Sequence, residues 1–143
     1  MHMLGEPRTM QAAPAYANVV EEVMSFLAER VGAAGCAGIT RERMVIDPGF
    51  GFGKTVEHNL ELLCNLERLA ELGVPLLVGL SRKSTLGAIT GRPADERMAA
   101  SVAAALLAVR HGARIVRVHD VAATRDALAV LEAVENTDHR VAY

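Results

Sequence analysis

Apolar residues recur along the chain at two spacings, and their alternation predicts helices separated by short strands. Steps of three and four residues indicate helices at about 17–31, 56–72 and 94–111, and a last helix that Asp120 caps. Short segments at 43–47, 75–79 and 114–118 are predicted to be strands, and the unbroken apolar run Leu76-Leu77-Val78 in the second is typical of a strand buried on both faces of a parallel sheet. The first helix is expected to end at Gly32, Gly35 and Gly38, residues 84–89 to form a short apolar turn, and Met98, Val102, Ala105, Leu106 and Val109 to face inward.

The order of strand and helix, repeated three times, predicts a parallel sheet with right-handed crossovers. Met1–Gly5 is short and apolar, as expected for the end of one preceding strand. This α/β pattern does not by itself choose between an open doubly wound sheet and a closed barrel.

The stretch Asp47-Pro48-Gly49-Phe50-Gly51-Phe52-Gly53-Lys54 follows the first clear strand. Proline ends the strand because it has no N–H, and glycines permit positive φ and close approach of a ligand. The spacing is neither that of a phosphate-binding loop nor that of a dinucleotide fingerprint. The two phenylalanines are equally consistent with a stacking surface for a flat ligand and with a plug over the core.

Polar residues also follow the other two strands, where α/β proteins place their sites. Ser81-Arg82-Lys83-Ser84 follows the second strand. Arg117 and His119, two residues apart on the third strand, share a face that suits phosphate or carboxylate. Ser84 stands where a helix start would favour an anion.

Each of these residues also has an ordinary structural explanation. Asp47 would cap its own loop, and Arg117 and His119 would pair with Asp120 or with a helix terminus. Solvated surface charges are the usual case for Lys54, Arg82, Lys83 and Arg92. Because the residues converge on three strand ends, the sequence instead favours a site for one flat polar group and one anion.

Composition narrows the class of protein further. The 143 residues fit one domain, and a net charge of −2 without a long basic run argues against a nucleic-acid partner. No apolar run is long enough for a membrane span, and the polar N-terminal residues do not resemble a signal peptide. Cys36 and Cys64 have no metal-ligand spacing and indicate reduced thiols in the cytoplasm.

Four stretches together resemble the dihydropteroate synthase family. They are Met1-His2-Met3 with Gly5, Pro7 and Thr9-Met10-Gln11; the stretch 47–54; Gly79-Leu80-Ser81-Arg82-Lys83-Ser84; and Arg117-Val118-His119-Asp120-Val121. The resemblance implies a (β/α)8 TIM barrel. It also implies a transferase of folate biosynthesis that condenses 6-hydroxymethyl-dihydropterin diphosphate with p-aminobenzoate, giving dihydropteroate and diphosphate. Sulfonamides would compete with p-aminobenzoate.

The resemblance also implies a role for each matching residue. Asp47, Phe52, Gly79, Lys83 and Arg117 would bind the pterin; Phe52, Lys83 and Ser84 would bind p-aminobenzoate; Arg117 and His119 would hold the diphosphate. In the family, diphosphate departs first and leaves a pterin-methyl cation that the arylamine attacks. None of these residues is implied to be a catalytic nucleophile or a metal ligand.

The chain departs from the family in length. A full barrel needs about 250 residues, so residues 1–143 correspond to its C-terminal half, the last three β/α units and the end of a preceding strand. The missing half would hold the Mg²⁺ ligand. We expect this partial pterin-binding barrel domain to be inactive alone and to self-associate, as a homodimer, through open sheet edges. Two alternatives stay open: a module that binds pterin or diphosphate without turnover, and a non-catalytic paralogue that partners a full-length synthase.

Overall fold

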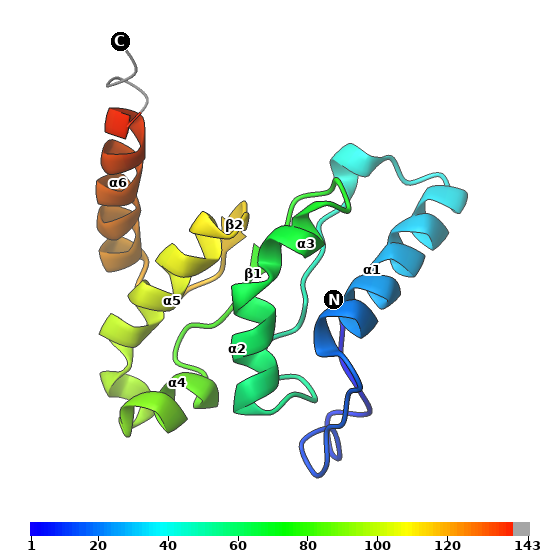
Figure 1. The fold of residues 1–143 in the computed structure, drawn as a ribbon, viewed down its shortest axis with the longest axis horizontal. Helices are drawn as coiled ribbons and strands as arrows, with labels where there is room; N and C mark the ends of the chain where they lie inside the picture. The colour runs from blue at the N-terminus through cyan, green and yellow to red at the C-terminus, as the bar shows by residue number, and fades with distance from the viewer. Residues whose placement is uncertain (139–143) are drawn as a thin grey trace.

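The computed structural model describes residues 1–138, which form an α/β fold with parallel strands. The helices follow one another along an open arc from α1 to α6, with the strands between α2 and α5 (Figure 1). In chain order the elements are α1 (Val19–Cys36), the 3₁₀ turn η1 (Arg41–Arg43), α2 (Val56–Cys64), α3 (Leu66–Ala70), β1 (Leu77–Val78), α4 (Ser84–Thr90), the 3₁₀ turn η2 (Ala94–Glu96), α5 (Met98–Arg110), β2 (Ile115–Val116) and α6 (Val121–Asp138).

The three predicted strands are present as parallel segments, but each is shorter than predicted. Leu77 of β1 pairs with Ile115 of β2, and a parallel bridge joins Ile46 to Leu76. Proline lacks an N–H, so Pro48 and Pro75 limit the ladder at the ends of the first two segments. The N-terminal segment lies beside the first of them, because the His2 N–H donates to the Asp47 carbonyl at 2.9 Å.

The register divides the strand residues between a buried and an open face. Ile46, Leu76 and Val78 are at most 4% exposed and belong to the core. Extending the register by one residue places Asp47 beside Leu77 and Ile115 on the opposite face. Ile115 is 39% exposed there. The face that carries Asp47 is therefore open to solvent in this part of the chain.

Helix α1 is longer than predicted, since it passes through Gly32 and Gly35. A glycine inside a helix costs about 1 kcal/mol relative to alanine, and the fully buried stripe of α1, which includes Val23 and Leu27, offsets that cost. Only Gly38, with φ +86°, lies where the chain has left the helix.

The predicted helix at 56–72 is broken into α2 and α3 at Asn65. Its side-chain amide donates to the Glu61 carbonyl at 2.8 Å and its backbone leaves helical geometry at φ −115°, ψ 22°. Asparagine competes with the helix through such local bonds. The hydrophobic spacing of 3.6 residues carries no information about this break.

The predictions for residues 84–89 and 94–111 are also corrected. Residues 84–90 form α4 rather than a turn, with Gly91 at φ +69° after the last residue. The helix predicted at 94–111 is η2 followed by α5, because Arg97 donates side-chain hydrogen bonds to the carbonyls of Arg82 and Arg92 and sits outside helical geometry. The buried positions of α5 are small: Ser101, Ala104, Ala105 and Ala108.

Helix α6 begins after Asp120, as predicted, but the carboxylate of Asp120 is used elsewhere. Its backbone carbonyl accepts the Thr124 N–H at 3.0 Å. Within residues 1–138, none of the helices combines the length and hydropathy that a membrane span requires.

Candidate pterin and anion site

Residues 47–54 form a tight turn, which we call the glycine loop. Its three glycines have φ between +63° and +74°, a region that favours glycine. A Cβ on Gly49 would lie 1.8 Å from the His2 carbonyl oxygen, and one on Gly53 would lie 2.5 Å from that of Leu4. The glycines therefore let the N-terminal segment close against the loop.

The two phenylalanines of the glycine loop have different surroundings. Phe50 is 1% exposed and belongs to the hydrophobic core. Phe52 is only half-buried, and its ring centroid is 4.7 Å from the Lys83 Nζ, a cation–π contact. The plug over the core is therefore confirmed for Phe50, whereas a stacking role of Phe52 stays a prediction.

Asp47 caps the loop with one oxygen, so its ordinary explanation holds in part. Oδ1 accepts the Gly49 N–H at 2.7 Å. Among the described residues, nothing donates to Oδ2. A partly exposed carboxylate with one oxygen fixed and one available can accept further hydrogen bonds from a ligand.

Lys83 connects the glycine loop to the other strand ends. Its Nζ donates to the Phe50 carbonyl, and its side chain passes Gly51. Burial lowers the pKa of the Lys83 ammonium; the negative charge of Asp47 opposes that shift and the Arg117 guanidinium adds to it. Lys83 is half-buried rather than a solvated surface charge, so that ordinary explanation is wrong.

A cavity of about 150 Å³ lies beyond the carboxyl ends of β1 and β2. It is lined by Gly79, Ser81, Lys83, Arg117, Val118 and His119. Four of the predicted site residues therefore meet in one place, and Lys83 joins them to Phe52 and to the Asp47 loop. Two cationic side chains, those of Lys83 and Arg117, line this small polar cavity, which therefore favours an anion.

Arg117 lies against the Gly79 backbone. A Cβ on Gly79 would be 3.0 Å from the Arg117 Nη2, so this glycine leaves room for the guanidinium. The predicted alternative, a pair between Arg117 and Asp120, is wrong because Asp120 binds Arg82 instead. In residues 1–138 no carboxylate pairs with Arg117.

Ser81 orients His119, a role that the sequence did not indicate. The Ser81 hydroxyl oxygen accepts the His119 backbone N–H at 3.1 Å and lies 2.9 Å from Nδ1 of the ring. With Nδ1 occupied by the hydroxyl, Nε2 is the ring nitrogen left to meet a ligand. Ser81 itself is 7% exposed.

Arg82 joins the loop after β1 to the loop after β2. Its guanidinium forms two hydrogen bonds with the Asp120 carboxylate, at 2.7 and 3.2 Å. These hydrogen bonds, which Arg82 donates and Asp120 accepts, lower the pKa of Asp120 and raise the pKa of Arg82. Arg82 is therefore not a free surface charge, whereas Arg92 is exposed, in line with its ordinary explanation, and pairs with Glu96.

Lys54 is buried, so its ordinary explanation as a solvated surface charge is wrong. It is 4% exposed, and Nζ lies 2.9 Å from the His2 Nδ1, 3.0 Å from the Gly49 carbonyl and 3.2 Å from the Phe52 carbonyl. Burial lowers the pKa of Lys54 to about 8, with Asp47 opposing the shift and Lys83 adding to it. Nothing in the sequence predicted the burial of Lys54 except its position next to Gly53.

Ser84, like Asp47 and Phe52, is a predicted site residue that does not line the cavity. It is the first residue of α4, as predicted, and is exposed directly after Lys83. Behind it, Asn59 is 2% exposed and ties α4 to the glycine loop: its amide donates to the Thr85 hydroxyl at 3.0 Å, and its Oδ1 accepts the Gly51 N–H.

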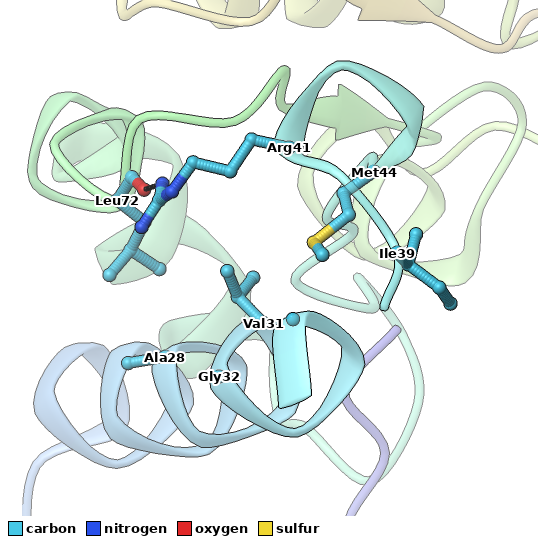
Figure 2. Close-up of a pocket in the computed structure, with 8 residues that line it drawn as sticks. Ala28, Val31, Gly32, Ile39, Arg41, Met44 and Leu72 are labelled. Carbon is cyan, nitrogen blue, oxygen red and sulfur yellow. Dashed lines mark hydrogen bonds between the residues drawn. The ribbon is translucent and has the colours of Figure 1, made fainter. Parts of the chain in front are cut away.

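A larger cavity, about 300 Å³, lies at the other end of the strands. Figure 2 shows it between the C-terminal part of α1, Met44 and Leu72. Its lining is apolar apart from Arg41, whose guanidinium already donates to the Leu72 carbonyl at 2.7 Å. This cavity holds none of the predicted site residues, so the smaller polar one is the candidate site.

The described residues do not fit a protein-bound magnesium ion. Mg²⁺ prefers carboxylate oxygen ligands, and residues 1–138 contain no group of three or more His, Cys, Asp or Glu placed to hold a metal. The cavity is instead lined by Lys83 and Arg117. This set of donors suits the anion itself.

Comparisons with known proteins identify the family to which this chain belongs. The sequence pattern of the pterin binding enzyme family matches residues 1–119, so the chain belongs to that family. It is 54% identical over 136 residues to the dihydropteroate synthase of Haemophilus influenzae and 46% identical over 133 residues to that of Escherichia coli K12, covering 95% and 93% of this chain.

Solved structures give the same result. The dihydropteroate synthase of Stenotrophomonas maltophilia is 61% identical with a TM-score of 0.91, and that of Xanthomonas albilineans in complex with 7,8-dihydropteroate is 55% identical with a TM-score of 0.87. Each covers 94% of this chain. The chain spans about half the length of the relatives it matches, 50% and 47% of the two sequences and 51% and 48% of the two structures.

Proposed function

We propose that this chain supplies the C-terminal half of a dihydropteroate synthase site, built on the last three β/α units of a (β/α)8 TIM barrel and the end of one preceding strand. The observation that carries the proposal is the convergence of Lys83, Arg117 and His119 on one cavity beside the Asp47 loop. The substrates would be 6-hydroxymethyl-dihydropterin diphosphate and p-aminobenzoate. The relatives support this: one structure holds 7,8-dihydropteroate, another 4-aminobenzoic acid, and a third, from Yersinia pestis, a sulfonamide drug complex.

Each residue has a stated part in binding. Oδ2 of Asp47 accepts hydrogen bonds from the amino edge of the pterin, while Phe52, Gly79, Lys83 and Arg117 border the ring. Phe52 and Lys83 also border p-aminobenzoate, and Ser84, next to Lys83, takes its carboxylate. The contact between Ser84 and this carboxylate is assigned from the family resemblance and not from the position of Ser84 at the start of the short helix α4.

In the reaction, the C–O bond to the diphosphate breaks and its electron pair leaves with the diphosphate. Arg117 and His119 stabilise that growing negative charge. The arylamine nitrogen then forms a C–N bond with the pterin methylene carbon and releases one proton. Mg²⁺ stays a prediction from the family, and no step is assigned to it. Self-association of the chain and a cytoplasmic location also stay predictions.

Calorimetric titration of the 143-residue chain with two ligands tests this function. We expect the pterin diphosphate to bind at least about tenfold more tightly than the free pterin alcohol, because only the former offers a diphosphate to Arg117 and His119. A folded chain that binds neither ligand at millimolar concentration contradicts the proposal.

Binding without turnover is the second candidate function. One observation favours it: the sheet face that carries Asp47 is open, with Val45 49% exposed, so the described residues enclose a ligand on one side only. Catalysis that depends on positioning is lost steeply when part of the site is absent. An assay of product formation separates the two candidates.

A further inference from the structure

Both lysines of this chain lie at the glycine loop. The sequence holds Lys54 and Lys83 and no other lysine, while every other basic residue apart from histidine is arginine. Lys83 lines the candidate cavity, but Lys54 does not, and no substrate contact is assigned to it. A buried ammonium that contacts no substrate needs its own explanation, because burying an unpaired charge is costly.

The surroundings of Lys54 are those of a bound cation. An ammonium has three N–H donors, and three acceptors converge on it: the His2 Nδ1 and the carbonyls of Gly49 and Phe52. Two of these acceptors belong to the glycine loop and flank Phe50 and Gly51. The third belongs to the N-terminal segment, which also donates the His2 N–H to Asp47.

We propose that Lys54 is a positioning residue: its ammonium fixes the glycine loop in the conformation that presents Asp47 and Phe52 to the pterin. This inference rests on the proposed function for the identity of the ligand. A neutral amine has only two N–H donors, so loss of the proton leaves one of the three acceptors facing a lone pair. The loop and its affinity for a pterin should therefore follow the protonation of Lys54.

The charges around Lys54 allow this titration near neutral pH. Burial lowers its pKa to about 8. Burial and the Lys54 charge lower the pKa of His2 to about 4, so the imidazole is neutral and its Nδ1 accepts a hydrogen bond. Burial raises the pKa of Tyr16, whose hydroxyl donates to the Gly53 carbonyl, to about 12. The remaining charged groups that act on this cluster are Asp47, Lys83, Glu22 and the N-terminal amine.

Nuclear magnetic resonance on the unmodified chain tests the first part. Protein labelled in the lysine side chains gives two signals, which the variant Lys83→Met assigns. We expect the Lys54 signal to titrate with a midpoint near pH 8 and the amides of Gly49, Gly51 and Gly53 to shift with the same midpoint. The inference is overturned if Lys54 titrates near its ordinary pKa of 10.5, or if the amide signals of the glycine loop do not shift with the titration of Lys54.

Ligand binding tests the second part, with 6-hydroxymethyl-dihydropterin as the probe. Between pH 7 and 9.5 the affinity of the chain should fall about tenfold, the effect of one lost charge-assisted hydrogen bond. Lys54→Arg keeps the positive charge at both pH values and should therefore remove this fall in affinity. Any effect of titration of the ligand itself is the same for the variant and for the unmodified chain. Arg92→Met, at an exposed site far along the chain, is the control and should behave like the unmodified protein.

The outcomes separate the inference from the proposed function. Binding with the same pH profile in the unmodified chain and in Lys54→Arg overturns the role of Lys54 and leaves the function standing. If no pterin binds at any pH while the loop amides still follow Lys54, the function fails and the structural role of the ammonium stands.

Discussion

Asp47 uses one carboxylate oxygen within the protein, and under the proposed function the other oxygen meets the pterin. Oδ1 is held at 2.7 Å by the Gly49 N–H, which fixes the direction of Oδ2. The same residue is linked through its backbone to His2. An anchor oriented in this way loses little freedom when a ligand binds, which is how preorganised groups gain affinity.

The substitution Asp47→Asn should weaken pterin binding by about 2–3 kcal/mol, the scale of a charge-assisted hydrogen bond. The asparagine Oδ1 can still cap Gly49, so the loop should persist. Calorimetry with the pterin alcohol measures the loss, and Asp126→Asn on α6, where the carboxylate is exposed, is the control. Unchanged pterin affinity in Asp47→Asn would remove this residue from the site.

Arg117→Ala or His119→Ala should weaken the pterin diphosphate by about 2 kcal/mol and the pterin alcohol by much less. The reason is that both side chains line the same cavity and that Arg117 has no carboxylate partner within residues 1–138. Arg114→Ala, at the other end of the same strand, is the matched control. Equal losses for both ligands would mean that the pair is structural.

The site residues differ in how far the sequence could predict them. Asp47, Lys83, Arg117 and His119 stand at strand ends, and α/β topology alone brings strand ends together. The contact between Ser81 and His119 and the burial of Lys54 depend on how loops from distant parts of the chain fold back, since His2 and Lys54 are 52 positions apart in the sequence. The spacing of apolar residues along the sequence does not indicate such contacts.

At the scale of elements, the N-terminal segment and the glycine loop form one unit. Gly49→Ala should destabilise the chain by more than about 2 kcal/mol, because the new Cβ would meet the His2 carbonyl at 1.8 Å in addition to the strain of φ +70°. Gly91→Ala has nearly the same φ, +69°, but no atom near the added Cβ, and should cost only about 1–2 kcal/mol. Urea denaturation compares them; equal losses would show that the segment does not press on the loop.

The loops after β1 and β2 are joined by Arg82 and Asp120, and this pair gives a prediction about pH. Arg82 lowers the pKa of Asp120 below its ordinary value of 3.8. A lowered carboxyl pKa stabilises the fold above the unfolded value, and that contribution is lost as pH falls through the folded value.

In Arg82→Gln the carboxyl titration of Asp120, followed by nuclear magnetic resonance, should therefore move upward toward its ordinary pKa. The acid-unfolding midpoint should rise with it. Arg125→Gln, whose guanidinium lies near the exposed Asp126, is the control and should change neither value. An Asp120 titration that is the same with and without Arg82 would contradict the pairing.

Helix positions were largely predictable because amphipathic spacing reflects burial, as the stripe of α1 illustrates. The ends and interruptions were not. Asn65 and Arg97 break helices through side-chain hydrogen bonds to carbonyls, and in α5 the buried face is the one with small residues, while Met98 is 48% exposed. Close packing of a helix rewards small residues, which a search for large apolar side chains overlooks.

At the scale of the whole molecule, the described chain has a closed outer side and an open inner side. Ile46, Leu76 and Val78 share one hydrophobic core with residues of α1, α2, α3 and α5, whereas Val45 and Ile115 on the other side are 49% and 39% exposed. Open sheet edges and contiguous apolar faces promote association. In relatives of twice this length, further chain is available to cover such a face.

The 143-residue chain alone should therefore self-associate and show no useful synthase activity. A dimer that covers the open face would repeat the residues of one half-site and still lack groups that a complete barrel contributes, and catalysis by positioning falls steeply with each missing group. Light scattering measures the mass of the purified chain, and an assay of dihydropteroate formation is run with and without the first half of the Haemophilus influenzae synthase. Activity that appears only when that half is added, and that Asp47→Asn then reduces, would support both the proposed site and the open face as its docking surface. A monodisperse monomer with full turnover on its own would refute the prediction.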